Sequence, residues 1–356
     1  MATATRDRGH DLTDELLSEV EKRVAAEYRK AAQEAEDKLA DYMRRFEIKD
    51  QIKRKQLEAG IITKDEYDTW RTGQIMMGER WERLRDNLAS DYHNANGVAR
   101  SVVSGYMPDV YALNHDYATY LAEKGARVDT SYTLYDRQTA ERILRDQPDL
   151  LPGPGTRMQQ AIAERKDIAW QAGQIQSVTL QSILQGESIP DMARRIAREM
   201  GEIDHKATIR YARTACTAAE SAGRLDGYRR ASDMGIKMRQ TWVATLDNRT
   251  RHEHRMLDGQ TVDIDEPFVV DGEEIRYPGD PAAAPHLIWN CRCRTIAQVK
   301  GFERDVSNQD LRHDAHLGNM SYDEWREAKA TSERITKQEE IARRMARRTI
   351  EEDYKR

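Results

Sequence analysis

Apolar side chains recur at helical spacing from Leu17 to Phe46. Successive apolar positions in this stretch lie three or four residues apart, so they form one stripe along one side of an α-helix. Asp11 or Thr13 can cap the start of this helix, and no proline interrupts it. The pattern predicts one long N-terminal helix, with a break near Glu47 as the alternative.

A capping signal marks the next helix. The side chains of Thr63 and Glu66 can each bond a backbone amide of the other residue, which predicts a helix that starts there and continues to about Leu88. The following segment, 105–136, is rich in tyrosine and is punctuated by Gly, Pro and Asn, which predicts short irregular pieces. Proline and glycine then concentrate at 147–155 and predict the main boundary of the chain.

Helical patterns resume after this boundary. Three helices are predicted, at about 156–186, 188–201 and 205–233. Ser188 can cap the second of these helices, and Gly201 is predicted to end it. The third helix carries small residues along one side, which allow close helix packing, and Cys216 among them is predicted to be a buried apolar side chain.

Alternating apolar and polar residues, broken by Gly, Asp and Pro turns, distinguish the region near 239–300. Helical signals return after it. The sequence therefore predicts a mainly α protein with a small α+β module, in which long amphipathic helices flank a short β-rich segment near 239–300. The predicted domains are a helical N-terminal region with the tyrosine-rich segment (1–150), a domain containing the β-rich segment (156–300) and a helical C-terminal tail (301–356).

Composition narrows the classes of function. Charged residues make up 33% of the 356 residues, the mean hydropathy is −0.86 and the net charge is −5, which predicts extensive solvated helix surface and no global attraction to nucleic acid. The apolar runs are too short to cross a bilayer, and the N-terminus lacks a hydrophobic signal region. Three cysteines without such a signal predict reduced thiols. A soluble protein made in the cytoplasm is expected.

Histidine and cysteine near the β-rich segment raise the question of a metal site. His254, Cys291 and Cys293 are residue types that zinc accepts as tetrahedral ligands. The proposed fourth ligands are His286, His252 and Asp247. Alternation along a strand would place the two cysteines on one face, as metal binding and simple core packing both require. Structural zinc and small buried thiols therefore both remain open.

The same residues permit a weaker hypothesis of catalysis. Asp247 and His254 could supply acid–base chemistry for a metal-dependent hydrolase or nuclease together with the cysteine pair. No nucleophile elbow, zinc-protease motif or phosphate-binding glycine loop accompanies them. Asp247 followed by Thr250 is also typical of a capped turn. Arg251 is expected to form an ion pair with a nearby carboxylate such as Asp258 or Asp263.

Arginine clusters offer the basis for DNA binding. The clusters comprise Arg194, Arg195 and Arg198; Arg224, Arg229 and Arg230; and Arg343, Arg344, Arg347 and Arg348. Pairs repeated every four residues place positive charge on one side of a helix, as phosphate contacts require. Glu340, Glu351 and Glu352 lie near the last cluster, so a solvated helix face of mixed charge is the alternative.

Taken together, these motifs resemble a known family. The order TWVATLDNRTRHEHRMLDGQTVDIDEPF, a YPGD turn and NCRC is similar to the Mu F-like minor head proteins of tailed bacteriophages, also called head-morphogenesis proteins. The resemblance covers about 170–300, and neighbouring segments extend it. The positions that carry it are Asp247, Thr250, Arg251, His254, Leu257, Gly259, Asn290, Cys291 and Cys293. His252 and His286 do not match the pattern, which weakens a metal site with four protein ligands.

The resemblance implies a virion protein present in few copies. Such a protein would lie in the capsid interior near the portal vertex after synthesis in the host cytoplasm, and would act in head assembly, genome packaging or DNA delivery. Its implied partners are the portal protein, capsid or scaffold proteins, and the packaged DNA. The family brings no settled enzymatic activity, although some members are fused to toxin domains, so no catalytic residue and no required cofactor are assigned.

Overall fold

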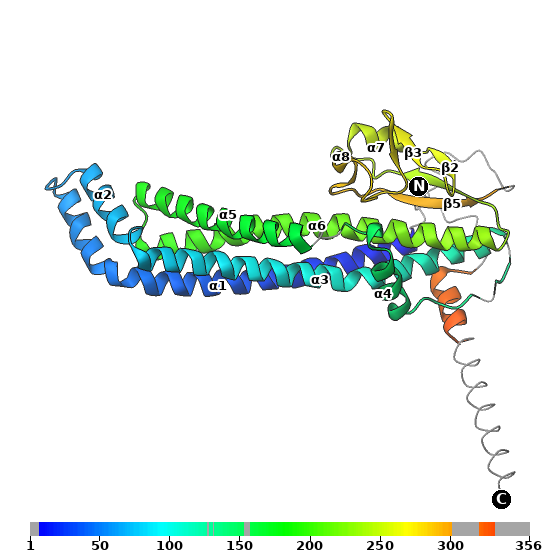
Figure 1. The fold of residues 1–356 in the computed structure, drawn as a ribbon, viewed down its shortest axis with the longest axis horizontal. Coiled ribbons are helices and arrows are strands. Elements are labelled where there is room, and N and C mark those ends of the chain that lie inside the picture. The colour runs from blue at the N-terminus through cyan, green and yellow to red at the C-terminus, as the bar shows by residue number, and fades with distance from the viewer. Residues whose placement is uncertain (1–6, 127, 131, 153–156, 301–319, 332–356) are drawn as a thin grey trace, which may run out of the picture. The chain divides into compact units, whose positions relative to one another are not determined.

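The computed structural model describes residues 7–126, 128–130, 132–152, 157–300 and 320–331. It confirms a mainly α protein with a small β module near 239–300 (Figure 1). The main helices are α1 (Arg8–Glu58), α2 (Lys64–Ile75), α3 (Glu79–Ala126), α4 (Arg137–Asp146), α5 (Arg157–Leu184) and α6 (Ile189–Asp233), with a 3₁₀ turn at Pro148–Leu150.

The chain forms two compact units, and each is discontinuous in sequence. The first, here called the helical unit, comprises Ser18–Gly105 and Gly153–Ala212. The second, the β-containing unit, comprises Met1–Leu17, Tyr106–Pro152 and Arg213–Arg356. The predicted Pro- and Gly-rich boundary contains one of the division points, whereas the other divisions fall inside α1, α3 and α6.

The helical unit is held together by one apolar core between its helices. The N-terminal stripe is buried as predicted from Val20 to Leu39 along an unbroken α1, and from Ala31 onward it belongs to this core. Beyond Leu39 the buried position shifts by one residue. Met43 is fully buried, whereas Tyr42, the next position of the predicted stripe, is partly buried at the edge of the core. Side chains from the other helices complete the core, among them Trp81, Leu88, Tyr92, Ile175, Ile183, Met192, Ile196 and Met200.

The helix ends in this unit agree only in part with the capping and glycine signals in the sequence. Thr63 and Glu66 form the predicted capping box at the start of α2. The helix ends at Ile75 and does not continue to Leu88 as predicted, because Gly78 adopts a φ of +92° between α2 and α3. Gly201 does not end a helix either. It lies within α6, where an added Cβ would make ordinary contacts, 3.6 Å from the Ala32 Cβ and 3.8 Å from the Tyr28 carbonyl oxygen.

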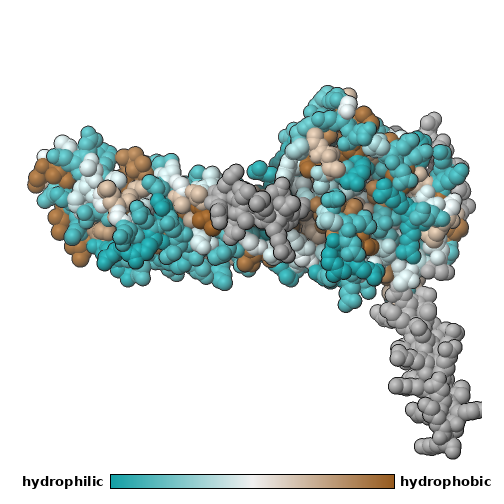
Figure 2. Space-filling view, in the orientation of Figure 1, coloured by the Kyte–Doolittle hydropathy of each residue, from teal (hydrophilic) through white to brown (hydrophobic). Residues whose placement is uncertain are grey.

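The surface of the helical unit is mainly polar. Figure 2 shows brown patches at the end of this unit where α1 meets α2. Exposed large apolar residues there are Ile48, Ile52, Ile61 and Met77. No helix in the described part of the chain is long and apolar enough to span a membrane.

The β module of the β-containing unit consists of a three-stranded sheet and a hairpin. Its strands are β1 (Met238–Val243), β2 (Thr261–Asp263), β3 (Phe268–Val270), β4 (Glu273–Ile275) and β5 (Arg294–Val299). Strand β1 lies between β2 and β5, and both pairs are antiparallel. The hairpin joins β3 and β4 through Asp271 and Gly272, whose φ angles of 51° and 81° suit a tight hairpin turn. Two short helices, α7 (His252–Leu257) and α8 (Pro285–Ile288), connect these strands.

The tyrosine-rich segment is helical over much of its length, contrary to the prediction of short irregular pieces. Helix α3 continues through Pro108 to Ala126. Burial outweighs the local helix-breaking signals here, because Tyr111, Tyr117 and Tyr120 lie in apolar cores. Residues 322–331 form a helix whose Trp325 indole donates a hydrogen bond of 2.7 Å to Glu123.

Small residues bring α3 and α6 into close contact in the β-containing unit, as the sequence predicted for the second half of α6. A Cβ atom on Gly223 would lie 2.4 Å from the Tyr111 carbonyl oxygen. One turn further on, a Cβ on Gly227 would lie 2.8 Å from the His115 carbonyl oxygen. Cys216 on the same helix is buried. No larger side chain fits at the two glycines without moving the backbone.

Candidate functional site

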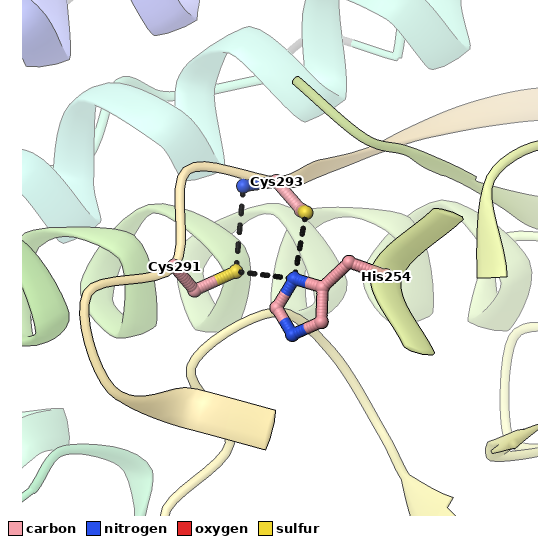
Figure 3. A group of neighbouring side chains, drawn as sticks. All are labelled: His254, Cys291 and Cys293. Atoms are coloured by element: carbon pink, nitrogen blue, oxygen red, sulfur yellow. Dashed lines mark hydrogen bonds between the residues drawn. The ribbon is translucent and has the colours of Figure 1, made fainter. Parts of the chain in front are cut away.

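His254, Cys291 and Cys293 converge inside the β module (Figure 3). His254 lies on α7, and the two cysteines lie in the turn that leads into β5. Helix α6 fixes this turn, since Thr217 donates a hydrogen bond of 2.8 Å to the Cys291 carbonyl oxygen. The cysteines precede the strand, so the predicted alternation along a strand is wrong, and the turn is what brings both sulfur atoms to one side.

Asn290 supplies the conformation that this turn requires. Its φ of 56° lies in the left-handed region, which asparagine adopts more readily than most residues. The backbone N–H of Asn290 donates a hydrogen bond of 2.9 Å to Thr214 on α6. The position of Asn290 in the NCRC motif therefore has a local structural reason.

The three side chains are in direct polar contact. The Nδ1 atom of His254 lies 3.2 Å from Cys293 Sγ and 3.6 Å from Cys291 Sγ. The other ring nitrogen, Nε2, lies 2.9 Å from the Leu287 carbonyl oxygen. A carbonyl oxygen only accepts, so Nε2 carries the proton and the lone pair of Nδ1 faces the sulfur atoms.

The two cysteines perturb each other's pKa. The contact with Cys291 lowers the pKa of Cys293 well below its usual value. The same contact with Cys293, together with burial, raises the pKa of Cys291. Of the two cysteines, Cys293 is therefore the one that ionises more readily. Chemically, this arrangement can bind a soft metal ion or form a fixed hydrogen-bonded cluster.

Access to the cluster is closed. His254 is 3% exposed, Cys291 is 2% exposed and Cys293 is 3% exposed. A nucleophile or general base has to reach its substrate, so this burial favours a role in holding the module together over turnover of a polymer.

Asp247 lies apart from the cluster and organises a loop. Its carboxylate accepts hydrogen bonds of 2.6 and 2.8 Å from the Arg292 guanidinium and one of 2.8 Å from the Arg249 amide. These bonds hold the pKa of Asp247 well below its usual value. Thr250 also contacts Asp247, so the predicted capped turn is present, whereas α7 itself begins after Arg251.

Other predicted contacts differ from those in the structure. Within the described residues, the metal-ligand group contains none of the three proposed fourth ligands. His286 lies 3.3 Å from Glu273 at the surface, and Asp247 is paired with Arg292. Arg251 donates to the Trp289 carbonyl oxygen and not to a carboxylate.

Gly259 and Asp258 complete the loop around the motif. Gly259 has a φ of +82°, and its N–H donates a hydrogen bond of 2.9 Å to the Trp242 carbonyl oxygen of β1. Asp258 accepts a hydrogen bond of 2.8 Å from the Ala244 amide. Both residues fix the path of the chain between α7 and β2, so the loop motif has a structural explanation.

The arginine clusters are largely engaged within the protein. Arg194 pairs with Asp191, and Arg195 pairs with Glu187 and Glu199. Arg229 pairs with Asp265, and the guanidinium of Arg230 lies 5.1 Å from the Tyr132 ring centroid. The last cluster, Arg343, Arg344, Arg347 and Arg348, lies outside the described residues.

Arg224 is buried, although the sequence pattern grouped it with Arg229 and Arg230 as a basis for DNA binding. It is fully buried, and each of its five N–H donors has an acceptor. It bonds the Asp7 carboxylate at 2.8 and 2.9 Å, Asn114 at 3.0 Å and the Thr295 carbonyl oxygen at 2.9 Å, and its second terminal nitrogen lies 3.0 Å from Glu220. This buried ionic cluster joins the start of α1, α3, α6 and β5. No local signal separates a buried arginine from an exposed one on an amphipathic helix.

Charge compensation inside this ionic cluster is extensive. Burial raises the pKa of Asp7, but Arg224 and Arg294 outweigh it, so the pKa lies well below the usual value. Burial likewise opposes ionisation of Glu220, and His10 and Arg224 bring its pKa below the usual value. The Glu220 carboxylate, 3.0 Å from His10 Nδ1, raises the pKa of His10.

A pH dependence of stability follows from the His10–Glu220 pair. The pKa of His10 is raised on folding, so its contribution is fully present below the unfolded-state pKa of about 6.5 and is lost as pH rises through the folded-state value. Glu220 and Asp7 have lowered pKa values and remain ionised in this window. We therefore expect the free energy of unfolding, measured by urea denaturation, to fall as pH rises above about 6.5.

The matched variant for this measurement is His10→Gln, which keeps hydrogen-bonding capacity and removes the titration. Its stability should change less with pH than that of the natural chain over the same range. An identical pH dependence in both proteins would show that His10 is not the group responsible.

The fold and the two buried clusters define a class of protein. They describe a helical protein that carries a small β module, which is supported by the buried His254, Cys291 and Cys293 side chains. In comparison with known proteins, residues 173–296 match the family described as Phage Mu protein F like protein. The matched range contains the end of α5, all of α6, the β module as far as the first residues of β5, and the His254, Cys291 and Cys293 cluster. This match and the similarity to a minor head protein described below support the Mu F-like minor head protein family for this chain.

Two curated relatives extend the comparison. The chain is 25% identical over 252 residues to minor head protein GP7 of Bacillus phage SPP1, which covers 70% of this chain and 77% of that protein. It is 33% identical over 178 residues to NAD(+)--arginine ADP-ribosyltransferase EFV of Enterococcus faecalis (strain ATCC 700802 / V583), which covers 49% of this chain. The chain spans only 35% of the length of the enterococcal relative. No solved structure matches the chain.

Proposed function

We propose that this protein is a minor component of a bacteriophage head that binds the portal protein inside the capsid and acts in head assembly and in genome packaging or delivery. The observation that carries the proposal is the similarity to a minor head protein over 252 residues. This alignment is longer than the matched range of 173–296, so the likeness extends beyond the domain that defines the family.

The geometry supports a structural role for the motif. The cysteine pair and His254 are buried, and Asp247 is held by Arg292 in a surface loop. A site that assembles Asp247 with His254 and the cysteines, as the hydrolase or nuclease hypothesis requires, is therefore not supported by the described residues. The motif stabilises a module that can present its surface to capsid partners.

Contact with packaged DNA remains the least supported part of the proposal. The described arginines of the first two predicted clusters include several that pair with acidic groups and one that is buried. Net charge gives no general attraction either, since it is −5. DNA binding through Arg343, Arg344, Arg347 and Arg348 stays a prediction.

Co-purification tests the proposed partner. The full chain is co-expressed with the portal protein of the same phage, and in parallel with the major capsid protein alone. We expect a tag on the portal to retain the chain after size-exclusion chromatography, because a portal-bound head protein needs a specific surface on that oligomer. The capsid-only sample is the matched control and should not retain it to the same extent.

The name of the enterococcal relative suggests a competing function, the transfer of ADP-ribose from NAD⁺ to arginine. Incubation of the purified chain with labelled NAD⁺ and an arginine-containing acceptor tests whether this chain transfers ADP-ribose. Because the chain spans only 35% of that relative, the relative's name does not by itself assign the transferase activity to this chain. Label on the acceptor, together with no retention by the portal, would replace a head function with an enzymatic one.

A further inference from the structure

The cluster of His254, Cys291 and Cys293 has the spacing of a zinc site. Zinc binds sulfur at about 2.3 Å and imidazole nitrogen at about 2.0–2.1 Å, so tetrahedral geometry places nitrogen and sulfur about 3.6 Å apart. The observed distances from His254 Nδ1 to the two sulfur atoms are 3.6 and 3.2 Å. All three ligand atoms lie within 4.8 Å of one another. Only small side-chain adjustments separate this arrangement from a coordinated one.

The surrounding hydrogen bonds also suit metal binding. His254 donates from Nε2 to the Leu287 carbonyl oxygen, which fixes the ring and leaves Nδ1 free to coordinate. Ligating histidines commonly make such a bond with their second nitrogen. The Cys293 amide approaches Cys291 Sγ at 3.4 Å, and an N–H donor stabilises negative charge on sulfur. These contacts orient two of the three side chains before any ion arrives.

We infer that His254, Cys291 and Cys293 bind one zinc ion, and that this ion joins α7 to the turn before β5. Thiol protons are released to solvent when the ion binds, because zinc coordinates the thiolate form. The three ligands are 2–3% exposed, so the ion would stabilise the module and would not meet a substrate. This inference concerns folding of the module and is independent of portal binding.

Metal analysis of the full-length chain provides the first test. The chain is expressed in zinc-supplemented medium, desalted and measured by mass spectrometry of the metal content. We expect about one zinc per chain in the natural protein and in Cys216→Ser. Cys216 is a matched control because it is also a buried cysteine and belongs to α6, outside the ligand group. The variants Cys291→Ser and Cys293→Ser should each lose the bound zinc.

A second measurement keeps the test decisive when a cysteine variant fails to fold. Cobalt is added to the metal-stripped natural chain, and the thiolate-to-cobalt charge-transfer absorption is recorded. Reactive thiols are then counted with and without a chelator. The inference predicts the absorption band and protection of two thiols that chelation exposes. A folded natural chain without zinc, without the cobalt band and with no change in reactive thiols would overturn it, as would selective binding of another metal.

Discussion

Replacing Arg224 with methionine is expected to lower the free energy of unfolding by about 3–5 kcal/mol, because it leaves buried carboxylates without their partner. Asp7 and Glu220 both lose a guanidinium contact, and Asn114 and the Thr295 carbonyl oxygen lose a donor. Each acceptor is then held away from water without compensation. Urea denaturation followed by far-ultraviolet circular dichroism measures the loss.

Arg229→Met is the matched control, since the residue lies on the same helix and its pair with Asp265 is exposed. Exposed pairs contribute about 0–1 kcal/mol, so this variant should remain close to the natural chain in stability. Equal effects at the two positions would show that the Arg224 contacts are not what stabilises the β-containing unit. Unchanged stability of Arg224→Met with weaker DNA binding would restore the phosphate-contact hypothesis drawn from the arginine pattern.

Gly223→Ala is expected to destabilise the chain by about 1–3 kcal/mol through overpacking. The new Cβ would lie 2.4 Å from the Tyr111 carbonyl oxygen and 3.2 Å from two other Tyr111 backbone atoms, so α3 and α6 must separate. Backbone atoms cannot rotate away as the end of a flexible side chain can. Thermal denaturation of the full chain gives the change in stability.

The matched control is Gly173→Ala on α5, where an added Cβ has no neighbour within 4 Å. Alanine favours the helix by about 0.5–1 kcal/mol over glycine, so this variant should be slightly more stable than the natural chain. Opposite signs for the same substitution would establish that close helix approach, and not helix propensity, sets the need for glycine at 223. Two stabilising substitutions would show that α3 and α6 lie further apart.

Long amphipathic patterns were predicted well because burial follows them directly. The stripe of α1, the capping box at Thr63 and the β-rich segment all depend on neighbours within a few residues or on simple periodicity. The tyrosine-rich part of α3 was not predicted, because Pro108 and Gly105 signal a break locally. Tertiary burial of Tyr111 and Tyr117 decides the conformation, and no local pattern shows it.

The candidate site was predictable in its residue types and not in its geometry. The sequence identified His254, Cys291 and Cys293 as potential partners, and the structure brings them together from α7 and a turn. The two cysteines are not brought together by alternation along a strand, as expected, because β5 begins only at Arg294. The conformation of the turn that carries them depends on contacts between distant segments, such as the hydrogen bond from Thr217 to the Cys291 carbonyl oxygen.

The buried ionic cluster around Arg224 also depends on contacts between distant segments, which the sequence pattern does not show. Its acceptors come from sequence positions as distant as Asp7 and Thr295. Sequence spacing placed Arg224 with Arg229 and Arg230 as one positive patch, whereas the fold buries the first and leaves Arg229 at the surface. Folding determines which arginines remain available to a partner.

The protein inventory of purified phage heads tests the proposed head function most directly. Heads are isolated from cells that produce the phage encoding this chain, with the portal gene intact or deleted, and their proteins are quantified by mass spectrometry. The account predicts that the chain is incorporated in small numbers into heads that contain the portal and is missing from heads that lack it. Exclusion of the chain from both kinds of head, or equal amounts in both, would contradict a portal-bound role.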